Sequence, residues 1–404
     1  MRKKLTFRIL SLALVSAVVM CCFVSLISCT SDDKGTPPSS GKAEPLRFTL
    51  SFDGYEDTRG YVSNDMDESV GLFAYIFDTN DLDDNENVGL IPPNYMYDEE
   101  MQYNGSEWQT VGAFDVPAAD KHMRIYAYYP FGLPEEILEL DFAQDENGPV
   151  GAPSLIYKVS QDIEEHIDLM AGRSVGDVPT NNIRTAGALR IGMSHLLTAV
   201  EFQIGKCSDN GRVVKIELKN VLGKNTYSLA QHLETVEDPN NPPNTIDQLV
   251  IDGWSNKNYE SNKSDYGNFA ATLSKKITKN MADNPTPQQV MDDENAFLMI
   301  PQDLPDSAKL EVTINAGGGD HVLTAPMAGK RWLQGKRVIY TLDVENLTKL
   351  SVKSQITNWN QHETVNGVAS DAVTIFIDTN INDWADSTFT MDSDNPNVLP
   401  PAQP

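Results

Sequence analysis

Segments in which every second residue is apolar constrain the fold of this chain more than any other feature. The first places four apolar residues on one face of an extended backbone: Leu46, Phe48, Leu50 and Phe52. A period of two residues is typical of a β-strand that buries one face. Short apolar or alternating segments recur at 71–77, 108–114, 123–129, 154–158, 187–193, 200–204, 214–218, 246–251, 297–300, 309–314, 338–344 and 350–356. Because turn-forming residues separate them, we predict a mainly β protein built from β-sandwiches.

Helical patterns are few and short. The best three lie at 134–140, 161–167 and 274–281. The least strand-like stretch, 172–186, contains Gly, Pro and two Asn, so we place a domain junction there. The predicted N-terminal domain is 46–180 and the predicted C-terminal domain is 181–360, which agrees with the size that one core usually supports.

The N-terminus has the organisation of a secretory signal. A basic leader at 2–8 precedes an uncharged, mostly apolar run from Ile9 to Ile27. The run ends in Leu26-Ile27-Ser28-Cys29, which resembles a bacterial lipobox and implies removal of 1–28 and acylation of Cys29, for example with palmitate. The alternative is a signal anchor, because the nineteen residues of this run are enough to span a bilayer. Both predict that the remaining chain leaves the cytoplasm.

Residues 29–45 do not have the composition of a folded core. They are rich in Ser, Asp, Gly and Pro, so we predict a flexible tether. Thr30-Ser31-Asp32-Asp33 resembles the acidic signal that sends lipoproteins of Bacteroidota to the outer leaflet of the outer membrane. One acyl chain anchors weakly, but the several chains of a bacterial lipoprotein hold firmly. The sequence therefore predicts a surface-exposed lipoprotein of the outer membrane.

Acidic residues strongly outnumber basic ones. The chain has 31 Lys and Arg against 58 Asp and Glu, and removal of 1–28 leaves 27 basic residues, for a net charge of about −31. Such a surface repels phosphate backbones and anionic lipid headgroups. We therefore expect no nucleic-acid partner and expect membrane attachment to depend on the lipid.

The sequence has no recognisable catalytic or metal-binding motif. The six histidines are scattered, and no nucleophile elbow, P-loop or Rossmann fingerprint occurs. The acidic segment 78–87 lacks the Gly that an EF-hand register requires, so we interpret it as a solvated loop rather than a calcium site. Gly317-Gly318-Gly319-Asp320 is typical of a hairpin turn, and Cys207, the one cysteine after Cys29, of a buried apolar residue. We predict no enzyme activity, metal or cofactor. A hydrolase with paired carboxylates is the distant alternative.

Several segments, in order, resemble the fimbrillin family of Bacteroidota, whose members are lipoprotein-derived type V pilins. They are the lipobox at Cys29, the strand 46–52 followed by Thr58-Arg59, and 124–130, 167–171, 194–197, 200–202, 297–302 and 356–359. The resemblance implies two tandem transthyretin-like β-sandwich domains and pili assembled by exchange of strands between subunits. It also implies that a trypsin-like protease cuts after Arg59 and displaces the strand 46–52. The alternative is an ordinary loop arginine, because anchoring subunits of such pili can keep their first strand.

The C-terminal extension, 361–404, carries a candidate donor strand. Its apolar stripe resembles that of 46–52 and consists of Val373, Ile375, Ile377 and Ile381. An emptied groove would bind such a strand through backbone hydrogen bonds, while side-chain pockets set the register. The alternative is that this segment pairs with an edge of its own domain. A second Ile-x-x-Trp at 381–384 echoes the one at 356–359 and indicates a tail longer than the usual end of the family.

We therefore predict a structural subunit of a cell-surface fimbria that supports adhesion or biofilm formation. The predicted partners are other fimbrial subunits, the outer membrane through the lipid, and a host or bacterial surface ligand. The competing prediction is a surface glycan-binding lipoprotein of a nutrient-uptake system, which would present exposed aromatic platforms. Tyr126 and Tyr128 share one face of a predicted strand, and we interpret them as core residues instead.

Overall fold

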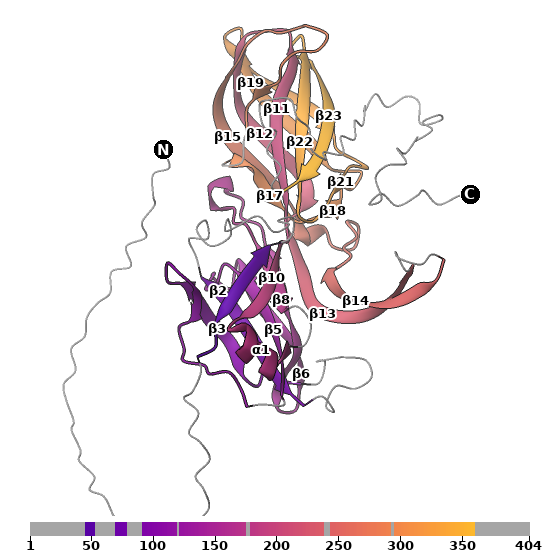
Figure 1. The fold of residues 1–404 in the computed structure, drawn as a ribbon. Helices are drawn as coiled ribbons and strands as arrows, with labels where there is room; N and C mark the ends of the chain where they lie inside the picture. The colour runs from indigo at the N-terminus through magenta and orange to yellow at the C-terminus, as the bar shows by residue number, and fades with distance from the viewer. Residues whose placement is uncertain are drawn as a thin grey trace, which may run out of the picture. The chain divides into compact units, whose positions relative to one another are not determined.

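The computed structural model describes residues 45–52, 69–78, 91–118, 121–174, 178–237, 243–291 and 295–359. Strands dominate these residues, so the prediction of a mainly β protein is confirmed (Figure 1). Within this described part the single α-helix is α1 (Thr180–Ala186), which ends at Gly187 in the left-handed conformation with φ 75°. Glycine is favoured there because it has no Cβ to clash with the backbone.

The N-terminal part forms an eight-stranded sheet that closes on itself. Its strands are, in spatial order, β2 (Val70–Phe77), β3 (Met96–Tyr103), β4 (Trp108–Thr110), β1 (Phe48–Phe52), β10 (Leu189–His195), β8 (Met170–Ser174), β5 (His122–Tyr129) and β9 (Val178–Pro179). Because β2 also pairs with β5, all of these strands except β9 form a closed ring. Closure of a sheet removes the unpaired edges to which other chains can add.

Strand β2 is buried on both faces. Val70, Leu72 and Ala74 belong to the apolar cluster inside the ring, and Phe73 and Tyr75 belong to a second cluster on the other face. A strand buried on both faces is apolar throughout instead of alternating. The sheet that packs on the outside contains β14 (Thr245–Trp254), β13 (Lys224–Glu237), β7 (Gly148–Lys158) and β6 (Leu138–Asp145). Phe142 of β6 meets Phe73 edge-on, with 5.1 Å between ring centroids.

The remaining strands form two sheets that share one apolar core. The first contains β16 (Gln288–Gln289), β17 (Phe297–Met299), β11 (Thr198–Cys207), β22 (Lys336–Glu345) and β23 (Lys349–Asn358). The second contains β15 (Tyr266–Ile277), β12 (Gly211–Leu222), β19 (Lys309–Ala316) and β20 (Gly319–Pro326). A short ladder pairs β18 (Gln302–Asp303) with β21 (Arg331–Trp332). In the core, Phe202 of β11 stacks on Tyr340 of β22 at 5.5 Å between ring centroids.

The three helical predictions are wrong. Residues 134–140 are a turn that leads into β6, 161–167 contain one 3-10 turn (Ile163–Glu165), and 274–281 overlap the end of β15. β15 pairs with β12 along its whole length. This pairing overrides the helical preference of Lys275 and Lys276, because context outweighs local propensity in sheets.

The predicted boundary at residue 180 falls within the closed sheet, because β10 lies beyond it and pairs with β1 and β8. The stretch 172–186 lacks a strand pattern because it contains the end of β8, the two-residue β9 and α1. The predicted hairpin turn is confirmed, since Gly317 and Gly318, with φ of 61° and 91°, join β19 to β20. The division into two transthyretin-like domains remains a prediction.

Candidate functional site

Strand β1 lies between β10 and β4 in the closed ring, and Figure 1 shows it in indigo beside β10. It runs parallel to β10 over five residue pairs. On its other side it has one antiparallel pair with β4, between Phe48 and Trp108. Just before the strand, the N–H of Leu46 donates to the carbonyl of Phe114 at 2.9 Å. β1 is therefore held mainly by β10.

The predicted alternation is confirmed where the side chains of β1 are described. Leu46, Phe48 and Leu50 are only 4%, 3% and 6% exposed and belong to the cluster inside the ring. Arg47, which alternates with them, is 53% exposed and lies 3.6 Å from Glu107. The backbone of Phe52 pairs with β10. The side chain of Phe52 lies outside the described structure, as do the predicted site residues Cys29, Arg59, Val373, Ile375, Ile377 and Ile381.

Removal of β1 would uncover an apolar slot. Its surroundings in the ring include Trp108 of β4 and Ile191 of β10, which are 3% and 0% exposed. Burial of three large apolar side chains contributes about 4.5–9 kcal/mol gross. This is similar to the whole net stability of a typical protein, about 5–15 kcal/mol. An emptied slot would therefore bind another apolar strand strongly.

β1 is not joined to either of its neighbours in the ring by a hairpin. No tight turn joins β1 to either neighbour, because the chain reaches β4 only after β2 and β3, and β10 much later. β4 is three residues long and offers β1 a short ladder. A strand held by pairing and burial, and not by a hairpin, can be exchanged without dismantling its neighbours.

Three segments singled out in the sequence, 167–171, 194–197 and 356–359, meet in one cluster. The ring of His195 stacks on that of Trp359, with centroids 4.5 Å apart and 17° between the planes. The Nδ1 of His195 lies 2.9 Å from the carboxylate of Asp168. The cluster was missed in the sequence because its members are far apart along the chain, and only the shared resemblance of these segments pointed to them.

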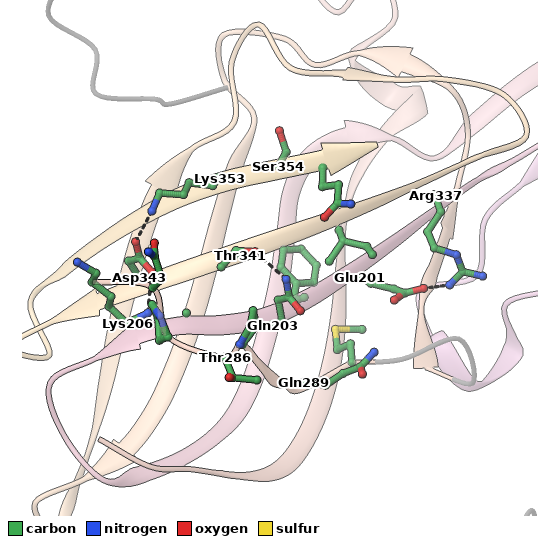
Figure 2. A pocket seen from close by; sticks show the side chains of 18 of the residues that line it. Glu201, Gln203, Lys206, Thr286, Gln289, Arg337, Thr341, Asp343, Lys353 and Ser354 are labelled. Atoms are coloured by element: carbon green, nitrogen blue, oxygen red, sulfur yellow. Dashed lines mark hydrogen bonds and ion pairs between the residues drawn. The ribbon is translucent and has the colours of Figure 1, made fainter. Parts of the chain in front are cut away.

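Figure 2 shows a polar hollow of about 590 Å³ on the face of β11, β22 and β23 that points away from the core. Gln203 donates to the hydroxyl of Thr341 at 2.8 Å, and Lys353 pairs with Asp343 at 2.9 Å. The segment 283–287 also lines the hollow. Several polar side chains of the lining therefore form hydrogen bonds or ion pairs with one another.

The hollow does not present an aromatic platform. Phe202 is the aromatic residue of its lining, and the side chain of Phe202 is fully buried. Tyr126 and Tyr128 are 0% and 3% exposed, which confirms them as core residues, and the hydroxyl of Tyr128 donates to Asp98 at 2.6 Å. These residues give the competing glycan-binding prediction no support, since that function needs exposed aromatic faces.

Across the described residues, no group of three or more His, Cys, Asp or Glu has the arrangement of a metal site. Nor is any helix in that part long and apolar enough to cross a membrane. Cys207 is buried as expected, and its thiol donates to the carbonyl of Asp209 at 3.0 Å. Burial raises the pKa of the Cys207 thiol, which makes it a poor nucleophile.

Comparison with known proteins identifies similar chains. A family model described as fimbrillin-like matches residues 58–359. Fimbrium subunit Fim1C of Phocaeicola vulgatus is 23% identical over 362 residues, which cover 84% of this chain and 89% of that protein. The crystal structure of a fimbrial protein from Bacteroides vulgatus has a TM-score of 0.50 at 16% identity and covers 78% of this chain and 99% of its own. This last likeness supports the fold.

Proposed function

Because the chain belongs to the fimbrillin-like family, we propose that it is a structural subunit of a cell-surface fimbria that assembles by exchange of β-strands. The observation that carries the proposal is the seating of β1, an apolar strand held in a closed ring by pairing and burial. A closed ring offers an incoming strand no edge until one of its own strands leaves. Departure of β1 would open that edge.

The exchange would begin with hydrolysis of the peptide bond after Arg59, which frees the segment that contains β1. Loss of β1 exposes the backbone donors and acceptors of the five β10 residues that pair with it, Leu189 to Met193, together with the slot that held Leu46, Phe48 and Leu50. In the extension of a neighbouring subunit, Val373, Ile375 and Ile377 repeat the spacing of those side chains, and Ile381 follows on the same face. Backbone pairing and apolar burial would then replace what β1 supplied.

We further propose that Cys29 carries the lipid that holds the precursor at the outer membrane after export. The basic leader and the lipobox-like end of the apolar run support this step. Other fimbrial subunits would be the partners, and adhesion or biofilm formation the outcome. Mass spectrometry of the N-terminus of surface-sheared protein tests the processing. A start at Gly60 would mark a processed subunit, and a lipidated Cys29 would mark a precursor or an anchor.

A matched pair of deletions tests the exchange. One variant lacks 371–384, which holds the candidate donor strand, and the control lacks the equally long 391–404. After treatment with trypsin, we expect polymers from the wild type and the control, seen as ladders in unheated gels and as fibres by electron microscopy. The variant without 371–384 should stay monomeric. Normal polymers from that variant would refute the donor role of the extension.

A synthetic peptide tests the emptied slot of the first subunit separately from the donor strand of its neighbour. A synthetic peptide of residues 371–384, added to trypsin-treated protein, should bind stoichiometrically and block polymer growth. A peptide with Val373, Ile375, Ile377 and Ile381 replaced by Ser should not bind, because the apolar contribution is removed while the backbone is unchanged. Equal binding of both peptides would contradict recognition by an apolar slot.

A further inference from the structure

The chain is held by several side chains at the point where β23 ends. We call this group, Asp168, His195, Glu201, Arg337 and Trp359, the terminal lock. Trp359 directly follows β23, and the residues after it lead into the extension 361–404 that contains the candidate donor strand. The proposed exchange of strands does not itself use any of these five side chains.

Trp359 is restrained through both its backbone and its ring. Its carbonyl accepts hydrogen bonds from Nη2 and Nε of Arg337 at 3.1 and 3.4 Å. Its indole ring stacks on the ring of His195. The preceding residue is also tied, because Oδ1 of Asn358 accepts from Nζ of Lys336 at 2.7 Å. The exit point of the chain is therefore fixed by contacts from two other strands, β10 and β22.

The groups that restrain Trp359 are themselves held in place. Arg337 forms an ion pair with Glu201, and the two side chains are 7% and 3% exposed. Breaking such a buried pair leaves an uncompensated charge, which is strongly unfavourable. His195 is 14% exposed and is oriented by Asp168. The terminal lock is thus a connected network with defined geometry.

β23 needs such a restraint because of its place in the sheet. Within the described part of the chain, β23 pairs with β22 alone and ends the order β16, β11, β22, β23. Its last pair joins Asn358 to Lys336. A pull on the following chain, directed away from β22, loads that pair first and then opens the ladder one pair at a time. Single backbone hydrogen bonds resist such opening weakly.

We propose that the terminal lock lets the C-terminal extension carry tension between subunits without peeling β23 from the sheet. The source of the tension rests on the proposed function, since an exchanged strand ties one subunit to the next. The protection of β23 does not depend on it. The lock acts where peeling starts, so it must fail before the ladder can open.

Hydrogen exchange of the full-length monomer tests the lock directly. His195→Ala and Trp359→Ala remove the stacked pair, and Trp359→Phe keeps an aromatic ring in place. Loss of an aromatic pair should speed exchange of the amides in β23 about fivefold. The control is His232→Ala, which removes another histidine beside an aspartate, with His232 Nδ1 2.6 Å from Asp252, in β13 and β14. Exchange in β23 should not change in the control and should stay near the wild-type rate in Trp359→Phe.

The outcome for His195→Ala decides the inference even if Trp359→Ala does not fold. Unchanged exchange in β23 of His195→Ala would overturn the lock. Optical-trap measurements add a mechanical readout, with one handle at the C-terminus and the other on the exposed turn at Gly317–Gly318. At constant force, His195→Ala should open about fivefold faster than wild type, and an equal rate would also overturn the lock. If polymers formed normally without 371–384, the proposed strand exchange would be refuted. The results on the monomer would not be affected.

Discussion

Replacement of Phe48 by Ala measures how firmly the slot holds β1. The Phe48 side chain is 3% exposed and belongs to the cluster inside the ring. Truncation of a buried Phe to Ala loses its transfer free energy and leaves a cavity, at a cost of about 3–5 kcal/mol. With a urea m-value of about 3 kcal/mol per M, the unfolding midpoint should fall by about 1–1.7 M.

The assay is urea unfolding followed by tryptophan fluorescence and far-ultraviolet circular dichroism. Thr49→Ala is the matched control, because Thr49 is the next residue of β1 and is exposed. Exposed substitutions usually change stability by about 0.5 kcal/mol or less. If Phe48→Ala and Thr49→Ala shifted the midpoint equally, β1 would not be seated as described, and the argument for an apolar slot would fail.

Two further substitutions probe other parts of the fold. Burial lowers the pKa of His166 from its ordinary 6.5, and its Nδ1 accepts the N–H of Leu298 at 3.0 Å, which requires a neutral ring. Its stabilising contribution is therefore complete above about pH 6.5 and is lost as the pH falls through the lowered pKa of the folded state. In His166→Gln, the melting temperature should fall less than in the wild type between about pH 7 and 5. An equal fall in both proteins would contradict this role of His166. Gly172→Ala should destabilise by about 1–3 kcal/mol or more in chemical denaturation, because a Cβ would overlap the backbone oxygen of Gly192. Gly319→Ala, whose added Cβ has no described atom within 4 Å, is its control, and equal stability of the two glycine variants would refute the clash.

Strands whose residue pattern follows the burial of their two faces could be predicted from the sequence. In β1 and the residues just before it, the buried Leu46, Phe48 and Leu50 alternate with polar residues, because one face lies inside the ring. β2 is apolar throughout because both of its faces pack in cores. In each case the pattern of apolar residues shows which faces of the strand are buried, because successive side chains of a strand point to opposite faces.

β3 was missed because its backbone interrupts the alternation. Met96 and Met101 are both buried, although their numbers differ by five and a regular strand would point them to opposite faces. Asp98 between them has φ 51°, and the register with β2 shifts in this region. A search for a period of two cannot join residues across such an irregularity.

The residues of a strand do not specify which other strands it pairs with. Nothing in 46–52 specifies that β1 runs parallel to β10, or that β2 closes the ring onto β5. These choices are set by packing among segments that are distant in sequence, and a short strand has several partners of suitable polarity. The candidate displaced strand could therefore be named from the sequence, but the slot that holds it could not be built.

β10 connects the slot of β1 to the exit of the extension. Leu189 to Met193 pair with β1, and His195, the last residue of β10, stacks on Trp359. In a polymer formed as proposed, the strand of one neighbour would lie along β10, and the chain that reaches the other neighbour would leave at Trp359. Part of the tension would then pass along the backbone of β10 and through the stacked pair of His195 and Trp359. A fibre built this way would resist stretching without unfolding the sheets of the subunit, because its two points of attachment meet on one strand, β10.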